Sequence, residues 1–469
     1  MSKFDITTSV FYRWRYWIGY GSILVLVIGL LFLTGIIMPE GIAKSEANSI
    51  IASSQLSLTE LWHNTTPNTP FYLLQKASLA IFGATFIGIK LPAFILGLLT
   101  AIGMIFLLRR WFSPGIAMLT SIIAIATGQF LFLTQQGSPG ILYLFWPTII
   151  LLFATLVANR ERFSIIWKVL LVISAALSLY TPLSIYVMVA LLSAVLLHPH
   201  LRYIIRKIPK LQILSGVFFG ILLLVPLALT IIKNPGVGFA LLGIPSEWPN
   251  LLANARDLVE QYFNFTSLGN RSILLPVFGL SSMLIILFGF YRIIRTRQTV
   301  QSYVILSWTV LLLPVLIINP IYISIMFVPL LLLLAFGLES LLRSWYGLFP
   351  RNPYARVTGL IPLIILVSSM VLFGLERFAY AYRYAPDITR NFSSDVLLIP
   401  NTSVLVVTHD EEELYKAIAQ YHENLTVTTT IPDAGEYAAT AAARDEQKVP
   451  TSIVTTGKTD DAARFYLYK

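Results

Sequence analysis

The segment between the first two strongly apolar stretches carries residue types that could do acid–base chemistry. It contains Glu40 and Glu46, and His63 follows in the same polar region. A positioned carboxylate can take a proton from a hydroxyl or an amine, which is the task of a general base. We therefore take Glu46 as the candidate catalytic residue, with Glu40 as a second carboxylate nearby. The simpler alternative is an ordinary solvated glutamate.

Further candidates for ligand binding lie at the edges of the next apolar stretches. Lys90 precedes a long apolar run, where its ammonium group could hold an anion, or could merely extend toward the membrane surface. Tyr72 could stack on a ligand or anchor in the membrane interface. Gln136 lies in a short loop further along the chain, and His63 could contact a ligand or be solvated. No metal-binding cluster of histidines and acids is evident, although the sequence leaves open whether a divalent metal ion assists.

The composition indicates a membrane protein with several spans. Charged residues make up 12% of the chain and hydrophobic residues 56%, and the mean hydropathy is +0.76. A soluble domain has roughly 25% charged residues, so a water-facing globule is excluded. Helices are expected because a lipid-exposed backbone must satisfy its own hydrogen bonds, and the runs lack the alternation of barrel strands.

Apolar runs near or above the roughly 20 residues that cross a bilayer predict about eleven transmembrane helices. We place them at 17–38, 87–108, 115–133, 141–157, 163–180, 183–197, 211–232, 272–293, 302–318, 322–342 and 357–375.

Every second connecting loop is rich in Lys and Arg, as at 109–110, 202–210 and 292–297. Such loops mark the cytoplasmic side. The pattern places the N-terminus in the cytoplasm and the C-terminus outside a plasma (inner) membrane. It also accounts for the net charge of +10 without nucleic acid as a partner.

Three larger polar pieces then face outward. The first outer loop, 39–86, has the spacing of an interfacial helix at 46–54, a capping box at 57–60 that could open a second, and a third helix from Pro70 to Gly83. In the second, 233–271, apolar residues from Leu251 to Phe263 follow one face of a surface helix.

The third piece, 376–469, is sharply more polar and forms a predicted second domain after the membrane domain 1–375. Strands are expected at 404–407, 425–429 and 452–454, and a helix at 411–419. The fold class is therefore an all-α polytopic membrane protein with interfacial helices and a small C-terminal extracytoplasmic α/β lobe.

The first outer loop resembles that of the C-type (GT-C) membrane glycosyltransferases, a superfamily that includes protein mannosyltransferases and the lipid A aminoarabinose transferase. The resemblance is carried by the order of its short motifs. These are Ser45-Glu46-Ala47, Thr69-Pro70-Phe71-Tyr72, Phe82-Gly83 and Lys90-Leu91-Pro92, with a later stretch from Pro320 to Gly337.

The resemblance implies an enzyme that transfers a sugar from a polyprenyl phosphate to a protein, lipid or glycan acceptor at the outer leaflet, by an inverting displacement. It implies Glu46 as the base and a partnership with membrane lipids. Ser45 stands where the family often has an aspartate, so Glu40 could supply the carboxylate, or the chain could be inactive.

Two alternatives stay open. A transporter or lipid flippase would usually carry acids or histidines within its spans, and this chain has few. A catalytically inactive scaffold would instead present the polar tail as its functional part.

Overall fold

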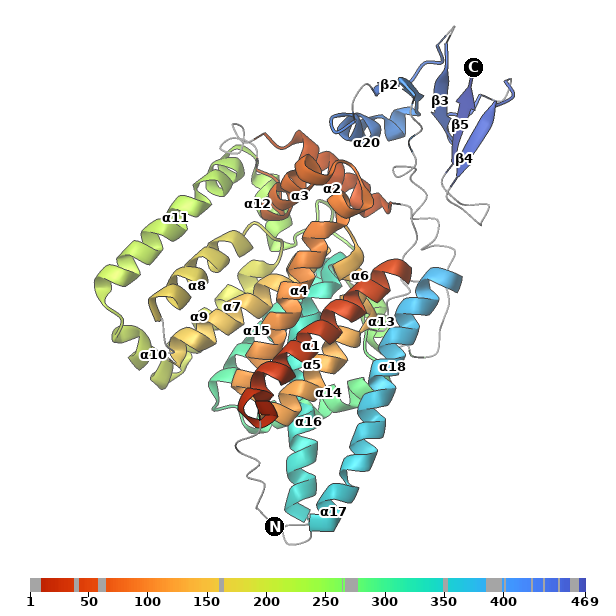
Figure 1. Cartoon of the computed structure of the whole chain (residues 1–469). Coiled ribbons are helices and arrows are strands. Elements are labelled where there is room, and N and C mark those ends of the chain that lie inside the picture. Colours follow the sequence, from red (N-terminus) through yellow and green to blue (C-terminus); the bar gives the residue numbers. More distant parts are fainter. Residues whose placement is uncertain are drawn as a thin grey trace.

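The computed structural model describes the greater part of the chain. The described residues are 10–37, 42–57, 65–159, 164–263, 265, 277–348, 353–384, 399, 402–422, 425–432, 435–445, 448–455 and 464–469. A helical bundle carries two short helices across one end, and a small sheet domain lies beyond them (Figure 1).

Each stretch that the sequence predicts as a span overlaps at least one helix, although 115–133 is divided between two helices and 272–276 lies outside the described residues. The helices at these stretches are α1 (Val10–Ile37), α4 (Phe86–Trp111), α5 (Pro114–Ala126), α6 (Gly128–Gln135), α7 (Leu142–Ala158), α8 (Ser164–Ser178), α9 (Ser184–Leu197), α11 (Lys210–Lys233), α14 (Leu280–Arg295), α15 (Val300–Ile318), α16 (Phe327–Leu348) and α18 (Leu360–Tyr384). The other described helices are α2 (Lys44–Gln55), α3 (Thr69–Phe82), α10 (Pro199–Arg206), α12 (Pro235–Leu242), α13 (Leu251–Phe263) and α17 (Pro353–Thr358), with the 3₁₀ turns η2 (Pro139–Ile141) and η3 (Pro320–Met326).

Six helices in the described part of the chain are long and apolar enough to cross a membrane, or up to eight if each bent pair forms one span. The bent pairs are α5 with α6, at 59°, and α9 with α10, at 95°. The protein is therefore a mostly helical, multi-pass membrane protein, whereas the count of eleven crossings stays a prediction. Because α16 lies at the centre of the main apolar core, both its faces are buried from Phe327 to Leu338.

The first outer loop folds largely as its sequence predicts. α2 covers the predicted helix at 46–54. α3 has Pro70 in its first turn and ends at Gly83, whose φ of 68° is a conformation that favours glycine. The capping box at 57–60 reaches beyond the described residues. In the second outer loop, α13 spans the predicted surface helix.

The C-terminal lobe is a mixed five-stranded sheet with strand order β2-β1-β3-β5-β4. Its elements are β1 (Val404–Val406), α20 (His409–Ala419), β2 (Thr426–Thr428), β3 (Tyr437–Thr440), β4 (Ser452–Thr455) and β5 (Arg464–Tyr468). β1 runs parallel to β2 and β3, while β5 pairs antiparallel with β3 and β4. The sequence predicts β1, α20, β2 and β4 but misses β3 and β5.

The lobe is held against the first outer loop by a shared apolar core. Tyr415 and Ile418 of α20 belong to the same buried cluster as Ile50 of α2 and Leu79 of α3. The lobe therefore rests on the loop that carries Glu46, as Figure 1 shows beside α2.

The start of α20 gives a test of this arrangement. Glu411 Oε2 accepts hydrogen bonds from the Thr408 backbone N–H (3.3 Å), the Thr408 hydroxyl (3.1 Å) and the Thr440 hydroxyl (2.7 Å) of β3. Glu411→Ala is expected to destabilise the lobe by about 1 kcal/mol, because the Thr408 N–H and the two threonine hydroxyls lose their shared acceptor. Hydrogen exchange of α20 in the full chain measures this, with exposed Glu413→Ala as control. Equal exchange in both variants would contradict the capping role.

Candidate active site

Glu46 lies at the start of α2, where it acts as the acid of a capping box. The backbone N–H of Ala43, the residue before the helix, donates to Glu46 Oε2 at 2.9 Å. A carboxylate in a first turn is also favoured by the helix dipole. The side chain is fully buried, with none of its surface exposed. The sequence leads us to expect a carboxylate at the membrane surface, whereas in the structure the side chain is enclosed by the protein itself.

The other carboxylate oxygen ties α2 to two further elements. The Gly137 backbone N–H donates to Glu46 Oε1 at 2.6 Å, and Lys90 Nζ of α4 lies 3.7 Å from the same oxygen. Lys90 is itself 4% exposed, and its ammonium group lies 4.2 Å from the centre of the Phe86 ring. Glu46 and Lys90 are thus a buried ion pair. Removing one member of such a pair would leave an uncompensated charge.

Gln75 completes this network, although sequence reasoning missed it. Its side chain is fully buried on α3 and accepts a hydrogen bond from Ser49 of α2 at 2.6 Å. Its amide group donates to the carbonyl oxygens of Ile89, at 3.1 Å, and Gly137, at 2.9 Å. The available signal was a glutamine within a mainly apolar helix sequence. We call Glu46, Lys90, Gln75, Ser49 and Gly137 the buried polar network.

Gly137 is required at its position because the chain passes very close to α4. A Cβ atom there would lie 2.8 Å from the Ile89 carbonyl oxygen and 2.7 Å from the Ile89 Cγ2. Just before it, Gln136 Nε2 donates to the Ser45 hydroxyl at 2.5 Å in an exposed position. The structure therefore brings together Glu46, Lys90 and Gln136, three of the residues singled out in the sequence, around the start of α2.

Tyr72 belongs to a neighbouring aromatic group. It lies close enough to Tyr143 of α7 to affect it electrostatically, and the rings of Tyr143 and Tyr322 are 5.9 Å apart, edge to face. Burial raises the pKa of the Tyr72 hydroxyl, and a hydrogen bond with Asn68 partly offsets this shift. Beside this group, Gln129 of α6 donates to Ser324 of η3 at 3.1 Å. Tyr72 could therefore offer a ring face and a neutral hydroxyl to a ligand.

Two other candidate residues, Glu40 and His63, lie outside the described residues. Among the described residues, no group of three histidine or acidic side chains is placed to hold a metal ion.

The geometry constrains what Glu46 can do. A general base must come within about 2.6–3.2 Å of the proton that it removes. Both oxygens of Glu46 already accept backbone N–H groups, and neither is exposed. Chemistry at this carboxylate therefore requires the buried polar network to open. In the conformation described, the network fixes α2, α3, α4 and the loop after α6 to one another.

Comparisons with known proteins bear on the kind of chemistry. Residues 66–229 match the family model described as dolichyl-phosphate-mannose-protein mannosyltransferase. This range begins just before α3 and ends within α11, and it includes Tyr72, Lys90 and Gln136. The comparison with curated proteins gives no match.

Solved structures share the fold across almost the whole chain. ArnT from Cupriavidus metallidurans in the apo state has a TM-score of 0.58 and 11% identity, with 96% of this chain and 98% of that chain covered. The same protein bound to undecaprenyl phosphate gives a TM-score of 0.51, 12% identity and the same coverage of 96% and 98%. The Archaeoglobus fulgidus oligosaccharyltransferase in the apo form has a TM-score of 0.51 and 13% identity, covering 84% of this chain and 64% of that one. Residues 66–229 are thus similar to this mannosyltransferase family, and the chain as a whole has the fold of ArnT and of the archaeal oligosaccharyltransferase.

Proposed function

We propose that the protein transfers a sugar from a polyprenyl phosphate to an acceptor at the extracytoplasmic face of the plasma membrane. The observation that carries this proposal is the family match over 66–229, because that family is named for a sugar donor of this class. The fold shared with ArnT supports it, since ArnT has been solved with undecaprenyl phosphate bound.

In this proposal the first outer loop and the start of α4 supply the reacting groups. Glu46 accepts the proton of the acceptor hydroxyl or amine as the acceptor attacks the anomeric carbon, and the sugar–phosphate bond breaks with inversion. Lys90 balances the charge of the departing phosphate. A phosphate that draws Lys90 away from Glu46 would also free the carboxylate, so donor binding and exposure of the base would be coupled.

The role of Lys90 can be tested by donor binding. Lys90→Ala is expected to weaken the binding of a polyprenyl phosphate at least tenfold, measured by native mass spectrometry on protein in nanodiscs. Lys44→Ala is the matched control, because Lys44 is an exposed cation in the first turn of α2. If Lys90→Ala binds the polyprenyl phosphate as tightly as wild type, the lysine does not bind the donor and serves only as the structural partner of Glu46.

Removing the lysine also leaves Glu46 buried without its counter-charge, which could unfold the loop. The double variant Glu46→Gln/Lys90→Met removes both charges and serves as the folded comparison. It should bind the donor as weakly as Lys90→Ala, whereas Glu46→Gln alone should keep most of the affinity.

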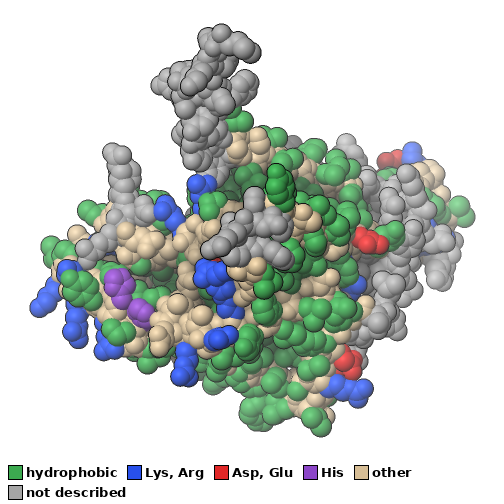
Figure 2. Space-filling model, turned by 90° about the horizontal axis from the view of Figure 1, so that it is seen from below, with side chains coloured by type: hydrophobic (Ala, Val, Ile, Leu, Met, Phe, Trp, Pro, Cys, Tyr) green, Lys and Arg blue, Asp and Glu red, His purple; other side chains and the backbone are tan. Residues whose placement is uncertain are grey.

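The proposed topology has eleven crossings, with the N-terminus inside and the lobe outside. Lys and Arg side chains gather on the face of the bundle opposite the lobe (Figure 2), as a cytoplasmic face requires. On the other side, the lobe rests on α2.

Because the chain contains no cysteine, the orientation can be tested with single cysteines. Ser45→Cys, at an exposed position, should react with a membrane-impermeant maleimide in intact cells. Thr296→Cys, exposed between α14 and α15, should react only after the cells are opened. The reverse labelling pattern would place Ser45 on the cytoplasmic side, and it would exclude the proposed reaction at the outer face.

The inactive scaffold remains the alternative function, and the complete burial of Glu46 favours it. A scaffold would present the lobe without consuming a sugar donor. Measured donor turnover therefore separates the two functions.

A further inference from the structure

The C-terminal lobe packs over the seam where α2 meets the start of α4. One buried apolar cluster contains Ala47, the neighbour of Glu46 in α2, and Ile89, the neighbour of Lys90 in α4. Ile418 of α20 belongs to the same cluster, so the lobe supplies part of the apolar cover on this seam. The two charges of the buried polar network are thus each flanked by a residue that is buried together with the lobe.

The helix α2 has a buried side and an exposed side. Ala47 and Ile50, which belong to the cluster shared with the lobe, are 8% and 0% exposed, whereas Lys44, Ser45 and Asn48 are exposed. α20 contacts α2 directly (Figure 1). Moving α2 away from α4 therefore breaks this apolar contact with the lobe as well as the ion pair.

The lobe also has a core of its own. Tyr437, Tyr466 and Tyr468 form a second buried cluster, whose described members include no residue of α2, α3 or α4. Because successive side chains of a strand point to opposite faces, Leu405 of β1 belongs to the shared cluster and Val406 to the second one. The lobe can thus leave the seam without losing its own core, and contacts between domains of one chain commonly allow such motion.

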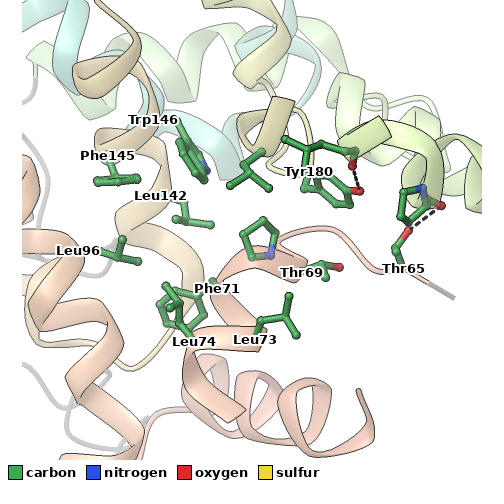
Figure 3. A pocket seen from close by; sticks show the side chains of 14 residues that line it. Thr65, Thr69, Phe71, Leu73, Leu74, Leu96, Leu142, Phe145, Trp146 and Tyr180 are labelled. Atoms are coloured by element: carbon green, nitrogen blue, oxygen red, sulfur yellow. Dashed lines mark hydrogen bonds between the residues drawn. The ribbon is translucent and has the colours of Figure 1, made fainter. Parts of the chain in front are cut away.

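The cavity beneath α3 gives no access to the ion pair from inside the bundle. It has a volume of about 540 Å³, and Figure 3 shows Phe71, Leu96 and Leu142 among the residues that line it. None of the side chains of the buried polar network lines this cavity. Leu74 lines it, whereas the next residue, Gln75, bonds within the network, so the two sites lie on different sides of α3.

We propose that the C-terminal lobe is a lid over the buried polar network. In the docked state the lobe holds α2 against α4 and keeps Glu46 and Lys90 enclosed. When the lobe lifts, the seam opens and both charges become accessible from the outer side. The lid therefore sets the population of the open state, as gating elements do in other enzymes. The proposal concerns access to the network and does not rest on the proposed function.

The lobe side of this contact can be changed without altering α2. Glu411 accepts from Thr440 of β3, and the Tyr415 ring contacts Phe465 of β5, so these positions of α20 face the sheet. Ala417 lies roughly 200° around the helix from Tyr415. It is nevertheless only 3% exposed and belongs to the shared cluster. Because α20 also packs against α2, Ala417→Arg should force the two helices apart.

A single cysteine reports the opening of the network, because the chain contains none. Ser49 is 1% exposed and donates to Gln75, so Ser49→Cys should react slowly with a small water-soluble thiol reagent in nanodiscs. Adding Ala417→Arg is expected to raise the labelling rate at least about tenfold, because local opening follows the free energy of the contact that is lost. Gln420→Arg is the matched control and should leave the rate unchanged. Gln420 is exposed at the end of the same helix, and its replacement brings the same change in charge.

Hydrogen exchange of β3 and β5 in the same samples shows whether the lobe stays folded. Faster labelling while both strands remain protected supports the lid. If Ala417→Arg unfolds the sheet, Ala417→Leu is a smaller wedge and must raise the rate at least about threefold with the sheet intact. Equal labelling of Ser49→Cys with and without the folded lobe variant would overturn the proposal. The test uses no transfer assay, so failure of the lid and failure of the proposed function are distinguishable.

Discussion

Glu46→Gln is expected to abolish sugar transfer and to lower the stability of the membrane domain by about 3 kcal/mol, the scale for breaking a buried ion pair. The amide can still accept from the Ala43 or the Gly137 N–H through its oxygen, but its NH₂ group cannot accept from the other. Lys90 also loses its counter-charge. Donor consumption measures the first effect, and thermal unfolding in nanodiscs measures the second.

Two further variants distinguish the loss of catalysis from the loss of stability when Glu46 is replaced. Glu260→Gln removes a partly exposed carboxylate that pairs with Arg256 on the surface of α13. It should leave donor consumption and thermal stability nearly unchanged. The double variant Glu46→Gln/Lys90→Met should recover stability because no charge is left buried. It should not recover turnover if Glu46 is the base. Full activity in Glu46→Gln, or turnover regained in the double variant, would exclude Glu46 from the chemistry.

Gly337→Ala is expected to destabilise the bundle by at least about 3 kcal/mol, at or beyond the upper end of ordinary overpacking. α14 and α16 cross so closely that a Cβ at Gly337 would lie 2.1 Å from the Ile285 carbonyl oxygen. A Cβ at Gly289, on the facing helix, would lie 1.9 Å from the Leu333 carbonyl oxygen. Backbone atoms cannot move aside as a side chain can, so the helices must separate. Small residues commonly permit such close approach between membrane helices.

The control for this substitution lies on the same helix. A Cβ atom at Gly347 of α16 would meet no other atom within 4 Å, so Gly347→Ala should be neutral or stabilising by up to about 1 kcal/mol through helix propensity. Thermal unfolding of the two variants in identical nanodiscs measures the difference in their stability. A Gly337→Ala protein as stable as Gly347→Ala would contradict the close crossing of α14 and α16.

Local sequence signals predicted the helices well because apolar length and end signals act over a few residues. Pro70 and Gly83 mark the ends of α3, and the acidic run after Thr408 marks the start of α20. β3 was missed because it is only four residues long and two of them are alanines, which are depleted in strands. It is a strand because β1 and β5 pair with it on both sides.

The candidate site was predictable in its residues but not in its geometry. The sequence singled out Glu46, Lys90 and Gln136, which the fold does bring to one place. It could not show that the Gly137 N–H binds the carboxylate or that Gln75 holds Gly137, because those contacts join parts of the chain that are far apart in sequence.

The most direct test of the proposed function is the release of free polyprenyl phosphate from its sugar-linked form. Purified wild-type protein in nanodiscs is supplied with the donor and with cell-envelope extract as the source of acceptor. Wild type is predicted to release polyprenyl phosphate in proportion to enzyme and time, and Glu46→Gln to release none above background. No release by the wild type, or equal release by Glu46→Gln, would contradict a transferase that uses this carboxylate.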